Sequence, residues 1–197
     1  MAEIILRVLD TRIGARFKNP KPSDIIVGSA TRLSTVMDQI VKAVGSNKLR
    51  TLSVCCHGYE AGVADERSAM SYQGGGFGLE LGADNLTWET VSAFSALNGK
   101  FASKGILEIY SCAAAQDSSG GNGFTGNGRL LMRELAGHAG ATVRASDTVQ
   151  EYTAGVVDIW VASWYEGVDF GEWEGNVWLF TPDGSRTRDS SPGRGVN

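Results

Sequence analysis

Short apolar segments alternate with amphipathic helical segments along this chain, and this alternation limits the folds that it can adopt. Segment 33–44 (LSTVMDQIVKAV) has the i, i+3, i+4, i+7 apolar spacing of a helix with one buried face, and Gly45 follows it as a C-cap. Segments 49–56, 106–110 and 142–145 have the length and composition of buried strands. Helices that connect such strands predict a mostly parallel central sheet with helices on both faces, which is a three-layer α/β sandwich.

The other elements are predicted from shorter patterns. We expect further strands at 4–9, 26–27, 79–81, 156–163 and 177–180, helices at 88–97 and 129–139, and loops at 10–23, 59–78 and 117–128. The chain has 197 residues, enough for one core. We therefore expect a single domain over 1–181, followed by a polar, flexible tail over 182–197.

Charge and composition exclude several classes of protein. The net charge is −4 and the pI is about 5.2, with no basic cluster, which argues against nucleic acid or an anionic membrane as a partner. No apolar run approaches the roughly 18 residues of a membrane span, and the N-terminus lacks the pattern of a signal peptide. An odd number of cysteines, three, does not fit a disulfide framework. We expect a cytoplasmic protein, with secretion by a signal-independent route as the alternative.

Polar residues directly follow three of the expected strands. His57-Gly58, Ser111-Cys112 and Ser146-Asp147 each come where an apolar segment ends. Because the carboxyl ends of parallel strands lie at one edge of a sheet, and ligand sites form beyond that edge, these residues are the candidates for a functional site.

Cys112 and His57 are the residues of this set that can perform covalent chemistry. A thiol next to an imidazole loses its proton more readily and becomes a nucleophile. The backbone N–H groups of Gly58 and Cys112 are candidate donors to an oxyanion, and each such donor typically contributes about 10²–10³ in rate. The alternative interpretation of Cys112 is a small residue buried in the core.

The remaining cysteines and the second histidine do not form a metal site in this interpretation. Cys55 and Cys56 are adjacent in a strand, so they point to opposite faces and cannot share an ion. We interpret both as core residues and His138 as a surface or C-capping residue. No metal and no organic cofactor is expected.

Asp147 has two interpretations. It is either a turn or capping aspartate or a carboxylate on the wall of a substrate pocket, where it would favour a basic side chain before the cleaved bond. Asp24 is the second candidate for that task, although it precedes a strand rather than following one.

Several motifs together resemble the caspase-like (clan CD) cysteine peptidases, and most closely the bacterial CHAT-type domains. They are LSVCCHGYEAG, LELG, ILEIYSCAAA and LMRELAGHAGATVRASD, and they span about residues 30–150. The resemblance implies a caspase-like sandwich that hydrolyses peptide bonds in peptide or protein substrates without a cofactor.

The same resemblance assigns roles to residues. Cys112 corresponds to the nucleophile, His57 to the catalytic histidine and Gly58 to the oxyanion glycine, while Ser111 and Asp147 fall in regions that shape the specificity pocket. Ala114 stands where caspases have glycine, and Ser111 also differs from caspases, so specificity for aspartate is not implied. Two alternatives stay open: an inactive caspase-like module that binds a regulatory protein partner, and another thiol acyl-transfer enzyme.

Overall fold

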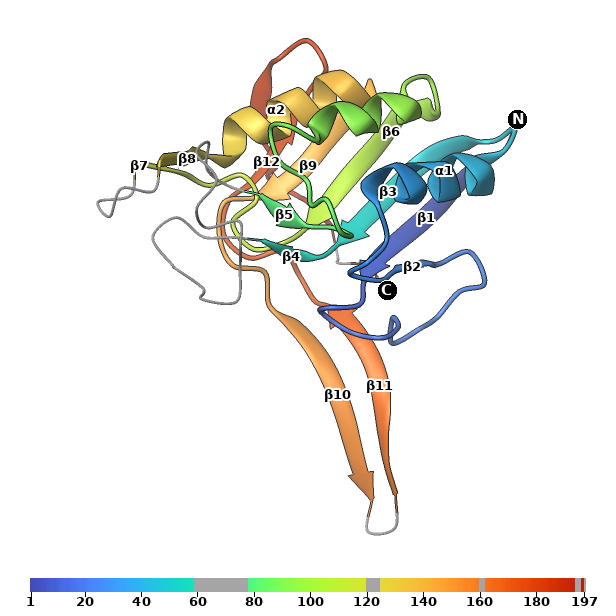
Figure 1. The fold of residues 1–197 in the computed structure, drawn as a ribbon. Coiled ribbons are helices and arrows are strands. Elements are labelled where there is room, and N and C mark those ends of the chain that lie inside the picture. Colours follow the sequence, from blue (N-terminus) through green and yellow to red (C-terminus); the bar gives the residue numbers. More distant parts are fainter. Residues whose placement is uncertain (59–77, 120–124, 160–161, 194–195, 197) are drawn as a thin grey trace.

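A seven-stranded sheet forms the centre of the computed structural model, which describes residues 1–58, 78–119, 125–159, 162–193 and 196 (Figure 1). The strand order is β13-β12-β9-β6-β3-β1-β2. These strands are β1 (Glu3–Asp10), β2 (Ile25–Val27), β3 (Lys48–Cys55), β6 (Phe101–Tyr110), β9 (Thr142–Ser146), β12 (Val177–Phe180) and β13 (Arg186–Arg188). All neighbours from β2 to β9 are parallel, whereas β12 is antiparallel to both β9 and β13. The expected mostly parallel sheet is therefore confirmed.

One face of the sheet is covered by α1 (Leu33–Val44), η2 (Val91–Leu97) and α2 (Gly128–Ala139) (Figure 1). The apolar stripe of α1 faces the sheet, with Val41 partly buried and its other members fully buried: Leu33, Val36, Met37, Ile40 and Val44. Alternate residues of the central strands, such as Leu52, Val54, Leu107 and Ile109, complete this larger core. None of the described helices is long and apolar enough to cross a bilayer.

The opposite face has no helix among the described residues, so the expectation of helices on both faces is wrong for this part of the chain. A smaller core lies there, with Leu9, Phe17, Tyr110, Val168 and Phe170 among its buried members. The segment between β1 and β2 contacts β11 (Ala162–Phe170) through a bridge from Phe17 to Val168. A loop and the base of a hairpin thus form the third layer, because strand residues on this side are more polar and need less apolar cover.

The expected helix at 88–97 is a 3₁₀ helix that begins only at Val91. Its buried residues Val91, Phe94 and Leu97 are spaced by three, which matches the three residues per turn of a 3₁₀ helix. Thr90 Oγ1 donates to the carbonyl oxygen of Asn85 at 2.7 Å, a contact that holds the preceding residues in a turn.

Two hairpins and one edge strand differ from the expectations. The single strand expected at 156–163 is a long hairpin of β10 (Tyr152–Ile159) and β11 (Ala162–Phe170), which extends away from the sheet (Figure 1). The glycine loop at 117–128 includes a short hairpin of β7 (Asp117–Ser119) and β8 (Thr125–Asn127). The tail at 182–197 contributes β13, which continues the sheet beyond β12, so this part of the tail is ordered by backbone pairing.

Candidate active site

The register of the sheet brings His57 and Cys112 to the same level. Cys55 at the end of β3 pairs with Tyr110 at the end of β6, and the two strands are parallel neighbours. His57 and Cys112 each follow this pair by two residues. The backbone N–H of Cys56 donates to the carbonyl oxygen of Tyr110 at 3.2 Å, which holds the two chain segments together beyond the last paired residues.

Gly58 packs directly on the backbone of Cys112. His57 and Gly58 form the two-residue strand β4. A Cβ atom at position 58 would lie 3.1 Å from the backbone nitrogen of Cys112 and 2.5 Å from Ser111 Oγ, and it would overlap the carbonyl oxygen of Cys112. A side chain does not fit in this space, so glycine is required for β4 to approach the Cys112 turn this closely.

Cys112 begins a turn that is held on the end of β9. The backbone N–H groups of Ala113 and Ala115 donate to the carbonyl oxygens of Thr148 and Ser146, at 2.9 and 2.8 Å. Cys112 is half-buried, and its Sγ lies 3.9 Å from the carbonyl oxygen of Gln150. The thiol is therefore at the border between core and solvent rather than sealed within the core.

Ala113 adopts a left-handed backbone conformation, with φ of 50°. This region is unfavourable for a residue with a Cβ, by roughly 1–2 kcal/mol, and such strain is concentrated at functional sites. The sequence AAA gives no signal for a positive φ, so this feature of the candidate site is found only in the structure.

The His57 ring lies beside an aromatic residue of the long hairpin. Its centroid is 6.3 Å from that of Tyr152, and the two rings meet edge to face at 64°. No sequence pattern marks Tyr152, because the strand predicted for this region begins only at residue 156. On its other side β4 pairs with β5 (Leu79–Glu80), with His57 opposite Glu80.

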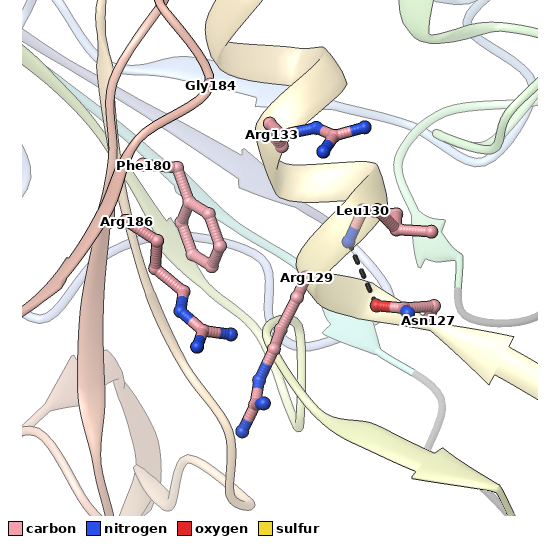
Figure 2. Close-up of a pocket in the computed structure, with 7 residues that line it drawn as sticks. All are labelled: Asn127, Arg129, Leu130, Arg133, Phe180, Gly184 and Arg186. Atoms are coloured by element: carbon pink, nitrogen blue, oxygen red, sulfur yellow. Dashed lines mark hydrogen bonds between the residues drawn. The ribbon is translucent and has the colours of Figure 1, made fainter.

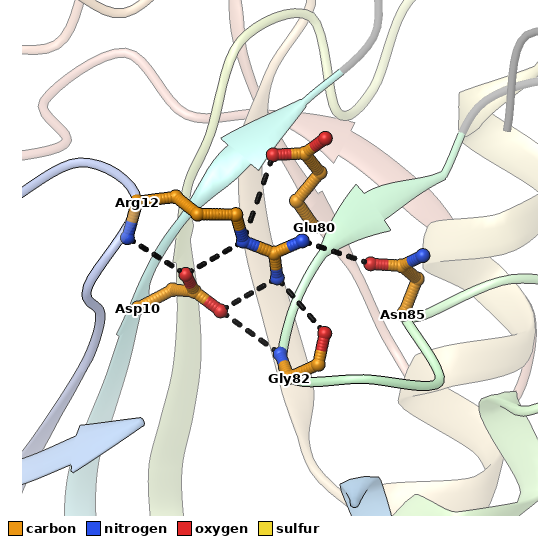
Figure 3. Close-up of polar contacts among 5 residues, drawn as sticks. All are labelled: Asp10, Arg12, Glu80, Gly82 and Asn85. Atoms are coloured by element: carbon orange, nitrogen blue, oxygen red, sulfur yellow. Dashed lines mark hydrogen bonds and ion pairs between the residues drawn. The ribbon is translucent and has the colours of Figure 1, made fainter. Parts of the chain in front are cut away.

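A partly buried polar network around Asp10 contacts β5 and the turn that follows it (Figure 3). The carboxylate of Asp10, at the end of β1, is fully buried and accepts hydrogen bonds from Arg12 Nε at 2.8 Å, Arg12 Nη2 at 2.7 Å and the N–H of Gly82 at 2.9 Å. Arg12 also donates to the carbonyl oxygen of Gly82 at 2.9 Å and lies 3.7 Å from Glu80. The network ties the residue opposite His57 to the end of β1 and so positions the histidine.

Cys55 and Cys56 lie on opposite faces of the sheet, as strand alternation predicts. Cys55 belongs to the smaller core and Cys56 to the larger one, with exposed fractions of 0% and 3%. Burial raises the pKa of Cys55 well above its ordinary value and that of Cys56 to about 12. Neither residue can supply a thiolate at neutral pH, which leaves Cys112 as the candidate nucleophile. Among the described residues no cluster of three or more potential metal ligands occurs.

The backbone of Asp147 is close to the Cys112 turn, but its carboxylate binds other residues. It accepts hydrogen bonds from the backbone N–H and the side-chain amide of Asn176, at 3.1 and 3.2 Å, and from Trp178 Nε1 at 3.1 Å. These contacts join the end of β9 to the start of β12, a structural role that matches the turn interpretation.

The structure does not bring Asp24 to this edge of the sheet. Asp24 precedes β2, at the level of Arg7 within β1, and the two side chains form a buried ion pair with contacts of 2.8 and 2.7 Å. Ser111 is brought to the edge, but it is 1% exposed and its hydroxyl lies under Gly58. Ser111 is therefore buried beside Gly58 rather than exposed on the wall of a pocket.

Comparison of the chain with protein-family models, with curated proteins and with solved structures finds no match.

Proposed function

We propose that this protein is a caspase-like cysteine endopeptidase that acts through Cys112 and His57. The observation that carries the proposal is the close packing of Gly58 on the backbone of Cys112, at the level that the pairing of Cys55 with Tyr110 sets. This packing brings the motif that contains His57 and Gly58 into direct contact with the motif that contains Cys112.

The arrangement supports a two-step hydrolysis. The Cys112 thiolate attacks the carbonyl carbon of the scissile bond, forming an S–C bond, and the carbonyl electron pair moves onto oxygen. The N–H groups of Gly58 and Cys112 are the proposed donors to this oxyanion. When the C–N bond breaks, protonated His57 gives its proton to the leaving amine. Water then hydrolyses the thioester, releasing the acid and regenerating the thiol.

The exposure of Cys112 favours an enzyme over an inactive interaction module. A thiol sealed in the core could not reach a substrate, whereas Cys112 is half-buried at the sheet edge. The preference for a basic residue stays a prediction. Asp147 already accepts three hydrogen bonds and Asp24 is in a buried ion pair, so either carboxylate would have to share or exchange its present contacts to bind a substrate cation.

Labelling with peptidyl acyloxymethyl ketones tests the proposal. A panel that varies the residue before the electrophile is incubated with the protein, and the modified cysteine is located by mass spectrometry of peptides. We expect modification at Cys112, loss of it in Cys112→Ala, and a strong decrease in His57→Gln. His138→Gln is the matched control, because it removes the other histidine, which contacts Ser95 at the far end of α2.

Two outcomes contradict the assignment. One is modification at Cys55 or Cys56 in the folded protein, and the other is equal labelling of His57→Gln and the wild type. Cleavage of a peptide library, with products identified as free acids or as transferred acyl groups, then separates hydrolysis from another thiol acyl transfer.

A further inference from the structure

The base of the long hairpin packs against both parts of the candidate site. Its first register pair is Tyr152 with Phe170. The Tyr152 ring meets the His57 ring edge to face, with 6.3 Å between the two centroids. The Phe170 ring lies 5.3 Å from the ring of Tyr110, which ends β6 two residues before Cys112. The hairpin is therefore joined by side-chain packing to His57 and to the strand that leads to Cys112.

Tyr152 is held in place by rings that are themselves buried. Its centroid is 5.6 Å from that of Phe170, which is 3% exposed. Tyr110 is 2% exposed and stacks on Trp173, with 4.1 Å between the centroids. Tyr152 is partly buried and packs against this smaller core. Because protein interiors are close-packed, buried neighbours of this kind leave the Tyr152 ring little freedom to move.

Backbone pairing alone does not fix the orientation of the His57 ring. The register of β4 with β5 places the backbone of His57 opposite Glu80, but it leaves both side-chain torsions free, and χ2 of histidine has broad minima. The carboxylate of Glu80 is directed to Arg12, 3.7 Å away (Figure 3). Tyr152 does meet the imidazole, and aromatic pairs have preferred relative orientations. The contact with Tyr152 therefore restricts the orientation of the imidazole.

We propose that Tyr152 is a positioning residue, which holds the imidazole of His57 in the orientation in which it takes the proton of the Cys112 thiol and gives it to the leaving amine. The inference rests on the proposed function and adds to it a residue outside the motifs of the sequence resemblance. Tyr152 takes no part in making or breaking bonds, and its contribution is to reduce the number of His57 orientations. A ring supplies this contact, so phenylalanine should replace tyrosine at this position and leucine should not.

Nuclear magnetic resonance on the full chain tests the contact without any measurement of activity. The chain has two histidines, so His57→Gln and His138→Gln assign the ring signals of each. In the wild type and in Tyr152→Phe, we expect nuclear Overhauser effects between the ring protons of residues 57 and 152. In Tyr152→Leu the neighbouring ring current is lost, so the His57 ring signals should shift while those of His138 stay in place.

Labelling of Cys112 by a peptidyl acyloxymethyl ketone measures the consequence for reactivity. Tyr152→Leu should lower the maximal labelling rate by about tenfold or more, because shifts of about 1 Å in catalytic geometry reduce rates by up to about 10². The reagent concentration that gives half of the maximal rate should not change, because the substitution acts on His57 and not on reagent binding. Tyr152→Phe should recover most of the rate that is lost in Tyr152→Leu.

Phe180→Leu is the matched control. It also exchanges a buried ring for leucine, in the larger core on the α2 side of β12 (Figure 2). Strands β9 and β6 lie between β12 and β3, the strand that leads to His57. Urea unfolding should show a loss of stability in Phe180→Leu, whereas labelling of the folded variant should proceed at the wild-type rate. An equal fall in the labelling rates of both leucine variants would overturn the inference.

Three further results would overturn it. One is wild-type His57 ring signals in Tyr152→Leu. Another is an equal loss of labelling in Tyr152→Phe and Tyr152→Leu, which would assign the effect to the hydroxyl group. The third is a change confined to the concentration for half-maximal rate, which would make Tyr152 a substrate-binding residue. If the wild type is not labelled at Cys112, the proposed function fails instead, and the His57 signals of Tyr152→Leu still decide whether Tyr152 positions the ring.

Discussion

Replacement of Gly58 by alanine is the most direct test of how the candidate site is built. The added methyl group would meet the nitrogen and the carbonyl oxygen of Cys112 and the hydroxyl of Ser111. Two of these three atoms belong to the backbone, which cannot rotate away as a side chain can. Either β4 or the Cys112 turn must therefore move, and both are held by neighbours: β4 by β5, and the turn by the end of β9.

The expected loss of stability follows from this crowding. Overpacking of a well-filled site typically costs about 1–3 kcal/mol, and a mid-range cost of about 2 kcal/mol lowers the folding equilibrium constant by roughly 30-fold. The displacement should also slow covalent labelling of Cys112 by about tenfold or more, because shifts of about 1 Å in catalytic geometry reduce rates by up to about 10².

The assay measures both quantities on the same preparations. Urea unfolding gives the free energy of unfolding, and labelling without urea gives the rate for folded protein. Gly137→Ala is the matched control. A Cβ at position 137, in the interior of α2, meets nothing within 4 Å, so alanine should stabilise the helix by about 0.5–1 kcal/mol and leave labelling unchanged.

Two results would refute the reasoning for Gly58. Wild-type stability in Gly58→Ala would show that the space beside Cys112 is not tightly filled. A loss of stability with an unchanged labelling rate would show that the close approach of β4 supports the fold but not the reactivity of Cys112.

Two further predictions concern buried ionisable groups. Burial holds the pKa of Cys56 at about 12, against 9.0 for an exposed thiol, and it also raises the pKa values of Cys55 and Tyr110. Because the unfolded chain releases these protons at lower pH than the folded chain, the free energy of unfolding should fall above about pH 9. In urea titrations on both sides of that pH, the free energy of unfolding of Cys56→Ala should fall less steeply with pH than that of the wild type. Equal slopes would contradict the assignment. Arg7→Met leaves Asp24 buried without its partner and should cost about 3–5 kcal/mol by urea unfolding, whereas the double variant Arg7→Met/Asp24→Leu should recover most of this loss. A double variant no more stable than the single one would show that the ion pair has a role beyond charge neutralisation.

Periodicity predicted the elements that bury one clear face. The helix at 33–44 has the bounds that its apolar spacing predicts, because the stripe from Leu33 to Val44 admits only one orientation against the sheet. The strand ends at His57 and Cys112 were also placed correctly relative to each other, since parallel strands direct their carboxyl ends to one edge.

Features that depend on distant partners could not be predicted in this way. The long hairpin was missed because no glycine, proline or asparagine marks a turn within 156–163. The engagement of Asp147 by Asn176 and Trp178 depends on the antiparallel placement of β12, which no local pattern encodes. The spacing of Val91, Phe94 and Leu97 did carry a usable signal, because intervals of three favour a 3₁₀ helix over an α-helix.

Because the three cysteines are unequally buried, their reactivity with a thiol reagent reports on unfolding of the chain. Cys55 and Cys56 are inaccessible in the folded protein, and Cys112 lies at the surface border. A disulfide reagent such as dithionitrobenzoate should therefore titrate one equivalent rapidly in native protein and three in urea. The slow appearance of the last two equivalents would then time the separation of the central strands β3 and β6, without any engineered probe. Immediate reaction of all three in the folded protein would contradict the burial described here.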